Sequence, residues 1–405
     1  MNFLLYYILR KLFVKLKFSD NEIFLEKGIL VKRAAVLPLS AIVQITSRRT
    51  VLMRVFRAKE ITVFTLGGKL RFFLSQNEPL PFLPIRRSVC LKPRFREVAF
   101  GAFIDTRALG GIFVFSAVLR RISTVFGGEY FNRIITAITD TANELERTLR
   151  FFRITVPKIA VTAAVFALGA WVFAYFRKLM RLSHFRVSQK NGFLFVQSGS
   201  FTLYEHALVL NSASAVYCDT FTTLFAKRAP LYLRGVMVAP CVKRERLPKT
   251  LNALCGFKMP KSKLSPPKRA TLGYVAAPLV WLGVFAAAIF AVYLLDFSSE
   301  LLKIALYCGF FINLYAAALY LIYMRHSGVG ADKFVLVSAR RGLRLYTAVF
   351  PPDTLDRRTL SQSVFQKRAG FANLKLFTVE RLKLTARQLP KDALPNRLFA
   401  RRFSE

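Results

Sequence analysis

Two neighbouring segments, 273–295 and 304–324, are uncharged and almost wholly apolar. They contain 23 and 21 residues. A helix rising about 1.5 Å per residue crosses the roughly 30 Å hydrocarbon core of a bilayer within either length. Only a short turn, which begins at Asp296 and includes Glu300, separates the two runs. The pattern predicts a transmembrane hairpin over 273–324.

A second hairpin is expected over 98–176. Residues 159–176 form an uncharged run of 18 residues, with Trp171 and Tyr175 placed as interfacial anchors near one end. The partner segment, 98–119, is apolar overall, but Asp105 and Arg107 interrupt it, and charges inside a bilayer are costly. It is either a short or tilted span or an interfacial segment. If all soluble segments share one side of the membrane, spans must come in pairs, which favours a crossing.

Two further segments have helical periodicity without the length of a span. Residues 130–152 repeat apolar side chains at helical spacing, which predicts an amphipathic helix on the outer membrane surface within the loop 120–158. A cytosolic location for that loop is the alternative, and would remove one span. Residues 1–17 also predict an amphipathic helix. That helix either lies in the cytoplasmic interface or packs against the segment that follows.

Between these segments, the stretches 18–85, 183–250 and 331–392 alternate apolar with polar residues and are rich in β-branched and aromatic side chains. This is the pattern of half-buried strands. The first two align without gaps, so that Gly28 meets Gly199 and Ile45 meets Val216. The third stretch diverges from the repeated pattern at its start and matches it more clearly near its end. Three related β-rich modules therefore alternate with the membrane hairpins.

Two stretches carry a family resemblance. Gly-Ile-Leu-Val-Lys-Arg at 28–33 leads to Leu-Pro-Leu-Ser-Ala-Ile at 37–42, and Gln-Ser-Val-Phe-Gln-Lys-Arg-Ala-Gly-Phe-Ala-Asn-Leu occupies 362–374. Together with the alternation of modules and spans, they resemble the bacterial pleckstrin-homology-like (PH-like) membrane proteins of the second type. The resemblance implies β-barrel modules, each closed by a helix, on the cytoplasmic face, with no established catalytic residue. The expected fold class is thus membrane α plus β, with about four transmembrane helices in two hairpins and three such modules, followed by a basic tail at 393–405.

Composition agrees with a membrane protein that carries polar modules. Apolar residues make up 54% of the 405 residues and charged residues 21%, and the net charge is +40. The basic residues are spread along the chain, which favours cytoplasmic flanks facing anionic lipid over nucleic-acid binding. The segment 242–273 carries nine basic residues against one acid, so it belongs inside, and the acidic turn near Asp296 belongs outside. Both termini are then expected in the cytoplasm of a bacterium.

The residues that carry enzyme chemistry are scarce. The five cysteines form no CxxC pair, and the three histidines have no ligand spacing, so neither a zinc site nor a disulfide framework is expected. No paired-carboxylate, P-loop, GxSxG or HExxH motif occurs. The sequence therefore predicts no catalytic residue, no metal and no cofactor.

Candidate binding residues are basic or amide side chains near the two signature stretches. Arginines flank the apolar positions of 51–56, which suits a short helix with one basic face. That face either docks on anionic headgroups or is simply solvated. The glutamines of the second stretch are expected to pack or to cap a helix more than to bind. The candidates are Lys32, Arg33, Arg48, Arg49, Arg54, Arg57, Gln362, Gln366, Lys367 and Arg368.

These observations predict a non-enzymatic integral protein of the bacterial cytoplasmic membrane. Its modules would bind the anionic inner leaflet or a protein partner, with a second PH-like membrane protein as one candidate, in a process such as envelope homeostasis. The alternative is a transporter of a small solute or lipid. Few polar groups lie within the spans, and Asn313 is the main one. A substrate path through a membrane would be expected to have more polar groups than this.

Overall fold

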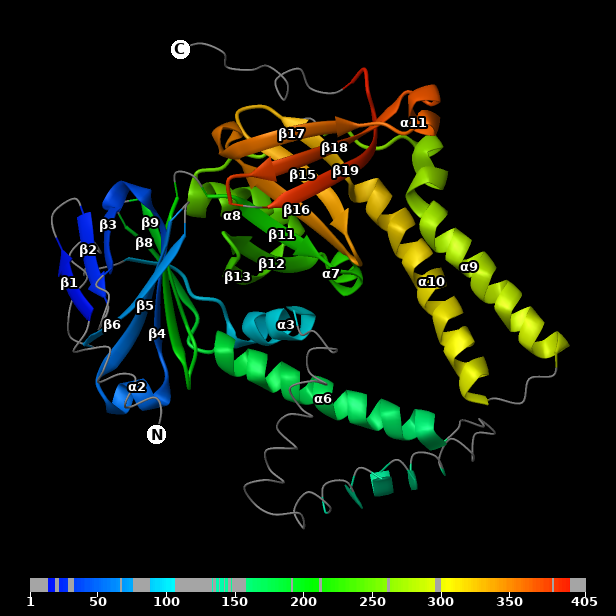
Figure 1. Ribbon diagram of the computed structural model, residues 1–405, viewed down its shortest axis with the longest axis horizontal. Coiled ribbons are helices and arrows are strands. Elements are labelled where there is room, and N and C mark those ends of the chain that lie inside the picture. The colour runs from blue at the N-terminus through cyan, green and yellow to red at the C-terminus, as the bar shows by residue number, and fades with distance from the viewer. Residues whose placement is uncertain are drawn as a thin grey trace.

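A computed structural model describes residues 14–18, 22–27, 33–65, 68–75, 88–105, 158–190, 192–210, 213–260, 263–295, 300–380 and 382–393, together with scattered positions between 133 and 147. It is a mixed α and β structure built on four antiparallel sheets (Figure 1). The sheets form the bulk of the molecule, and the helices over residues 271–294 and 300–326 extend from it.

Each β-rich module has the same order of elements: three strands, then a strand, a short helix and two more strands. Module 1 has β1 (Val14–Phe18), β2 (Glu22–Lys27), β3 (Arg33–Pro38), β4 (Ile42–Arg49), α2 (Val51–Val55), β5 (Ala58–Thr65) and β6 (Lys69–Ser75). Module 2 has β8 (Arg186–Lys190), β9 (Phe193–Ser198), β10 (Leu203–Val209), β11 (Ala215–Asp219), α7 (Phe221–Ala226), β12 (Arg228–Leu233) and β13 (Val236–Lys243). Module 3 has β14 (Gly328–Ala331), β15 (Val335–Arg341), β16 (Arg344–Phe350), β17 (Leu355–Ser361), α11 (Val364–Arg368), β18 (Phe371–Thr378) and β19 (Lys383–Pro390).

The short helix of every module begins at a hydroxyl residue. Thr50, Thr220 and Ser363 are the N-caps, and the side chain of each accepts a hydrogen bond from the backbone N–H three residues later. Such a cap satisfies a backbone donor that the first turn of a helix leaves free. The third helical residue is buried in every copy, as Met53, Thr223 and Gln366. Polar caps and buried third positions thus fix the same helix three times.

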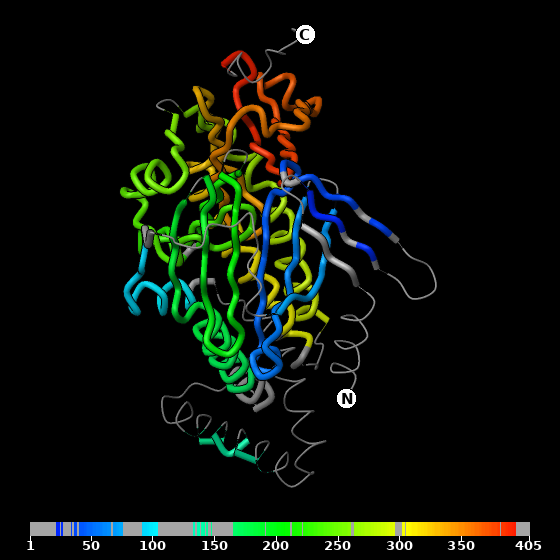
Figure 2. The backbone as a smooth tube through the Cα atoms, turned by 90° about the vertical axis from the view of Figure 1, so that its left-hand side faces the viewer, coloured from blue at the N-terminus to red at the C-terminus, as the bar shows by residue number. Residues whose placement is uncertain are grey.

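The modules share sheets and do not close on themselves. Strand β4 of module 1 pairs with β10 of module 2, which gives a seven-stranded sheet in the order β6-β5-β4-β10-β9-β8-β7. Strand β11 of module 2 pairs with β16 of module 3, which gives a six-stranded sheet in the order β13-β12-β11-β16-β15-β14. We call these two strand pairs the first joint and the second joint. Figure 2 shows the blue strands of module 1 running beside the green strands of module 2.

The expectation of closed barrels is therefore wrong for the described residues. The first three strands of a module and its last three lie in different sheets. The fourth strands of modules 1 and 2 pair with the following module, and β17 of module 3 pairs with β18 at the end of a separate sheet. The first and last sheets, β1-β2-β3 and β17-β18-β19, keep only three strands. Each shared sheet is covered on both faces. Phe195 of β9 packs in the core of module 1, whereas its neighbour Leu194 packs in that of module 2.

Two helices in the described residues are long and apolar enough to cross a membrane, where four were expected. They correspond to α9 (Thr271–Leu294) and α10 (Glu300–His326), and they pack against each other. The expected span 159–176 lies in α6 (Lys158–Leu182), which is not one of the two.

The expected span 98–119 is wrong at its start. Residues 95–105 form α3 (Phe95–Asp105), which packs against β13. Val98 and Ala102 are buried in the core of module 2, and a Cβ on Gly101 would lie 2.4 Å from the carbonyl oxygen of Pro240. Val98 and Ala102 therefore pack against protein, whereas Phe103 of the same helix is 46% exposed. Residues 106–119 and most of the loop 120–158 lie outside the described residues.

The remaining elements lie between modules or between two strands of one module. Strand β7 (Ser88–Leu91) extends the seven-stranded sheet, and α8 (Leu247–Cys255) follows β13. One-turn helices lie at Leu39–Ala41, Arg244–Arg246, Lys268–Ala270 and Pro352–Thr354. At the N-terminus, the last residues of the expected helix 1–17 belong to strand β1. Residues 1–13 of that segment lie outside the described part.

Candidate functional site

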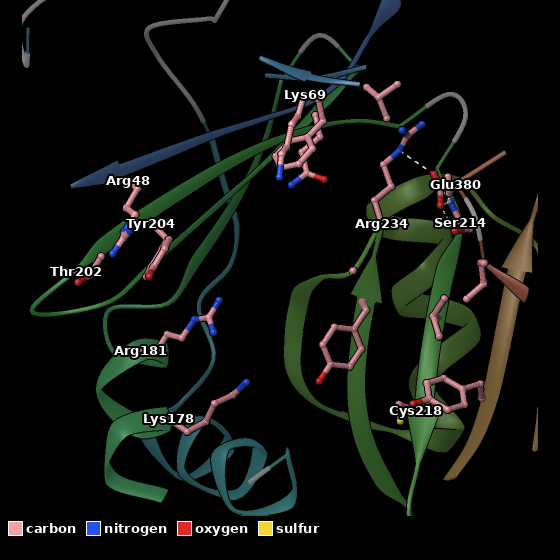
Figure 3. A pocket seen from close by; sticks show the side chains of 18 of the residues that line it. Arg48, Lys69, Lys178, Arg181, Thr202, Tyr204, Ser214, Cys218, Arg234 and Glu380 are labelled. Atoms are coloured by element: carbon pink, nitrogen blue, oxygen red, sulfur yellow. Dashed lines mark hydrogen bonds and ion pairs between the residues drawn. The ribbon is translucent and has the colours of Figure 1, made fainter. Parts of the chain in front are cut away.

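A cleft of about 1550 Å³ opens between the modules. One wall comes from β4, the turn between β9 and β10, and the C-terminal half of α6. The other comes from β11, β12, β16 and the turn after β18. Figure 3 shows Arg48, Lys178 and Arg181 projecting from the first wall, across from Cys218 and Arg234 on the second. The cleft therefore exists only because three modules and a helix meet there.

Basic side chains dominate the charged lining. Glu380 is the single acid among the lining residues, and its Oε1 lies 2.9 Å from Nε of Arg234. Burial raises the pKa of Glu380, and the charge of Arg234 and the hydrogen bonds from Ser214 partly oppose that rise. With this acid neutralised by its partner, the remaining lining charge is positive. The basic lining residues are Arg48, Lys69, Arg177, Lys178, Arg181, Arg234 and Arg344.

Aromatic and apolar side chains form the rest of the walls. Tyr204 lies under the guanidinium of Arg181, with 5.2 Å from Cζ to the ring centroid, a cation–π contact. Positive charge above apolar walls suits a ligand with an anionic head and an apolar body. The aromatic and large apolar lining residues are Phe64, Phe173, Phe176, Phe201, Tyr204, Tyr232, Tyr346 and Leu382.

The helix α2 stands at the rim of this cleft and presents apolar side chains to the outside. Leu52 and Val55 are 61% and 71% exposed, although Met53 between them is buried. Arg54 fixes the helix to module 2, because its Nη2 donates to the carbonyl oxygens of Ser200 and Phe201 at 2.5 and 3.4 Å. Phe201, a cleft residue, is itself exposed. The tip of α2 and the β9–β10 turn thus form one apolar surface beside the basic end of α6. We call this surface the α2 rim.

The structure gathers several sequence candidates at the first joint, mostly in structural roles. Arg49 lies 3.9 Å from Glu205 across the joint, and Arg48 lies 3.7 Å from Glu60 while also lining the cleft. Arg57 adopts a left-handed φ of 47° where α2 ends. Arg33 begins β3, and Lys32 lies outside the described residues. Arg48 and Arg54 are therefore the candidates closest to the cleft and its rim.

The candidates of the second signature stretch form a separate group on module 3. The side chain of Gln366 accepts from the Ser363 N–H and donates to Oδ1 of Asn373, and Gln362 donates to the carbonyl oxygen of Phe371. Both glutamines hold the local fold. Lys367 and Arg368 end α11, which Figure 1 places at the opposite end of the molecule from α2. The two groups do not form one site.

Sequence reasoning missed the contribution of α6 and module 2 to the cleft. Arg177, Lys178 and Arg181 indicated the orientation of a span, but their spacing also places them within one helical turn. That spacing is the signal from which a basic face could have been inferred. Arg234 and Arg344 gave no such signal, because their approach to the cleft depends on the second joint.

The comparisons with known proteins single out the first module. Residues 2–89 match the family model described as a bacterial PH domain. No curated protein and no solved structure matches the chain. The N-terminal part of the chain is thus PH-like, and PH domains commonly bind lipids or proteins. In the described residues, no group of three or more His, Cys, Asp or Glu side chains is placed to hold a metal ion.

Proposed function

We propose that this protein is a non-enzymatic membrane protein whose PH-like array docks on the anionic leaflet through the α2 rim. The observation that carries the proposal is the exposure of Leu52, Val55 and Phe201 beside basic residues of α2 and α6. Exposed apolar side chains in one patch are unfavourable in water and commonly mark an interaction surface. Arginine and lysine around such a patch favour anionic lipid as the partner.

The apolar hairpin supports a membrane as the setting. The first turns of α9 and the last turns of α10 pack on module 3, where Tyr274 and Tyr323 are buried. Farther from the sheets, α9 and α10 expose large apolar residues such as Trp281, Phe290 and Phe311. Figure 1 shows this part of the hairpin standing clear of the sheets. In the proposed topology it crosses the bilayer, and both termini and all modules lie in the cytoplasm.

The energies of the α2 rim suit attachment to a surface. Full burial of a Leu or Val side chain contributes about 1.5–3 kcal/mol, and each basic residue near an anionic surface adds about 1 kcal/mol. Neither term alone holds a protein firmly at a membrane, but two combined signals do. A hairpin that already tethers the chain raises the effective concentration of the rim at the lipid. The rim then sets the orientation of the array.

A protein partner is the second candidate, favoured by α11. Phe365, at the second position of that helix, is 82% exposed, and Val364 beside it is also exposed. Leu52 occupies the same position in α2. Because α11 and α2 lie at opposite ends of the molecule, one flat membrane is not expected to cover both. Nothing in the described residues supports the alternative of a transporter.

An environment-sensitive fluorophore tests the proposal in the full chain, reconstituted into vesicles of neutral lipid or of neutral lipid with about one-third anionic lipid. Leu52→Cys carries the label, and Phe365→Cys is the matched control at the equivalent helix position. We expect a blue shift at position 52 that grows with anionic lipid and weakens at high salt, and little change at position 365. A label at position 52 that reports water in both vesicle types would contradict membrane docking.

The contribution of charge is measured in the same labelled protein. Arg57→Asn and Arg177→Gln together remove two positive charges near the rim, and asparagine tolerates the left-handed φ of position 57. We expect the double variant to lose most of the anionic-lipid dependence while it retains the blue shift in part. An unchanged dependence would show that these charges do not contact the lipid surface.

A further inference from the structure

The two joints between modules have the same register. In the first joint, Ile45 lies opposite Ala207, and in the second, Ala215 lies opposite Val349. Ile45 and Ala215 are equivalent, since each precedes the N-cap of its module, Thr50 or Thr220, by five residues. The chain has therefore built one strand-pairing interface twice. In both cases the fourth strand of one module joins the third strand of the next.

Two further described strands are equivalent to the two strands that form a joint. Strand β17 is the fourth strand of module 3: Arg358 precedes the N-cap Ser363 by five residues and lies opposite Leu376 of β18. In module 1, Ile45 likewise precedes its N-cap by five residues and lies opposite Val63 of β5. Strand β3 is the third strand of module 1. In the described residues, β3 and β17 are each paired on one side only, at the ends of their three-stranded sheets.

The exposure of one side chain distinguishes β3 from the equivalent strands β10 and β16, which pair with a preceding module. Val36 lies opposite Phe24 of β2, as Ala207 lies opposite Phe195 and Val349 opposite Leu336. Ala207 and Val349 are 3% and 1% exposed, whereas Val36 is 53% exposed. The same repeat position is thus buried wherever a preceding module covers it. In module 1 an apolar residue occupies this position too, although no described strand pairs with that edge of β3.

We propose that β17 of one copy of this chain pairs with β3 of a second copy, in the register of the two internal joints. Val36 then lies opposite Arg358 of the second copy. Pro38, which cannot donate to a ladder, corresponds to Val209, a residue beyond the six pairs of the first joint. Arg33 falls opposite Ser361 and Leu37 opposite Arg357, so no two like charges are opposed. The inference does not depend on the proposed lipid docking.

A second copy fits these edges better than an unrelated strand. Exposed sheet edges readily pair with other chains, and this chain already carries the complementary edge at its other end. Head-to-tail contacts of this kind either close into a ring or extend as a filament. Tethering of the copies to one membrane favours closure in its plane. A third joint would also extend the array of modules without any new type of contact.

Disulfide trapping between separately tagged full-length copies tests the pairing. One copy carries Val36→Cys and the other Arg358→Cys, and they are co-expressed and oxidised in membranes. We expect a mixed cross-linked dimer that requires both cysteines and exceeds the background from the native cysteines by at least about tenfold. Leu360→Cys in place of Arg358→Cys is the register control, since it lies on the same face two residues along β17. We expect it to cross-link far less.

Two results would overturn the proposal. One is equal cross-linking of the register control. The other is a cross-link from Arg358→Cys to a cysteine placed within 394–405 of the same chain, with none to Val36→Cys, because that segment would then fill the β17 edge. Val36→Asp provides a second measurement. We expect it to abolish self-association in light scattering, and to leave the thermal unfolding midpoint unchanged at dilutions where the unsubstituted chain no longer associates, since the side chain is half-exposed in a single chain.

Discussion

The first and second joints share a register but differ in chemistry. Across the first joint the side chains are largely polar: Thr46 Oγ1 lies 3.0 Å from Nδ1 of His206, and Arg49 lies 3.9 Å from Glu205. Across the second joint every residue of β11 is buried, and Val349 of β16 is almost completely covered. One backbone interface therefore accommodates two different sets of side chains.

The surroundings of each joint explain the difference. The second joint lies between the cores of modules 2 and 3, to which Ala215 and Val216 contribute from opposite faces. At the first joint, the side chains of Arg48, Arg49 and Glu205 are 48%, 22% and 23% exposed, so polar side chains there reach water. Strand pairing thus sets the order of modules, whereas the covering layers decide which side chains a joint requires. The second joint is therefore the more sensitive to substitution.

The largest effect is expected from Arg234→Met beside the second joint. The substitution leaves Glu380 buried without its cation, which costs about 3–5 kcal/mol of unfolding free energy. Arg234→Met with Glu380→Met should recover most of that loss, because no isolated charge then remains. Thermal unfolding of the purified protein in detergent measures both variants. A double variant as unstable as the single one would contradict the role of the ion pair.

Opposite pH dependences are expected at the two joints. Burial raises the pKa of Asp219, at the end of β11, from 3.8 to about 6, so the folded protein binds its proton more tightly than the unfolded chain. Its contribution to stability therefore falls as pH rises from about 4 to 6. Burial, aided by the charge of Arg181, lowers the pKa of His206 from 6.5 to about 4, so its contribution rises over nearly the same window. Each is worth up to about 3 kcal/mol across that window.

Asp219→Asn and His206→Gln separate these two contributions. Compared with the unsubstituted protein, Asp219→Asn should make stability rise more steeply between pH 4 and 6.5, and His206→Gln should make it rise less or fall. Unfolding midpoints at three pH values across this range measure the slopes. Slopes that change in the same direction in both variants would contradict the assigned protonation states.

The smallest effect is expected from Thr46→Val at the first joint. Valine keeps the β-branched shape but removes the hydroxyl that contacts His206, at a cost of about 1 kcal/mol. Thr347→Val is the matched control near the second joint, because it leaves the buried Ser338 hydroxyl without its partner at 3.1 Å. We expect the control to lower the unfolding midpoint more. A larger fall in the unfolding midpoint for Thr46→Val than for Thr347→Val would show that burial does not decide which joint is more sensitive to substitution.

Much of each module could be predicted from sequence, but the connections between modules could not. Alternation of residue types predicted the strands, and the ungapped alignment that places Gly28 on Gly199 holds through the third strands. It then slips by one residue, because Ile45 corresponds to Ala215 and not to Val216. A shift of one residue exchanges the two faces of a strand. Sheets covered on both faces make the alternation too weak to detect that shift.

The cleft could be predicted only in part. Arg48 and Arg54 were sequence candidates, and they lie in the cleft wall and at its rim. Arg234 and Arg344 reach the cleft through pairing that joins residues more than 100 positions apart. The start of the expected span at Val98 was misassigned for a related reason, since an apolar helix packed on a sheet has the same local composition as one that faces lipid.

Local sequence was enough to predict the strands, the short helix over 51–56 and the apolar hairpin, because each follows from the periodicity of neighbouring residues. Only the tertiary structure shows that the fourth strand of a module pairs with the next module. Backbone hydrogen bonds are the same for any two strands, so they do not specify which segment of the chain pairs with which. The tertiary structure likewise decided which apolar residues are covered. Val36 and Val349 are the same residue type at the same repeat position, and only the module beside Val349 buries it.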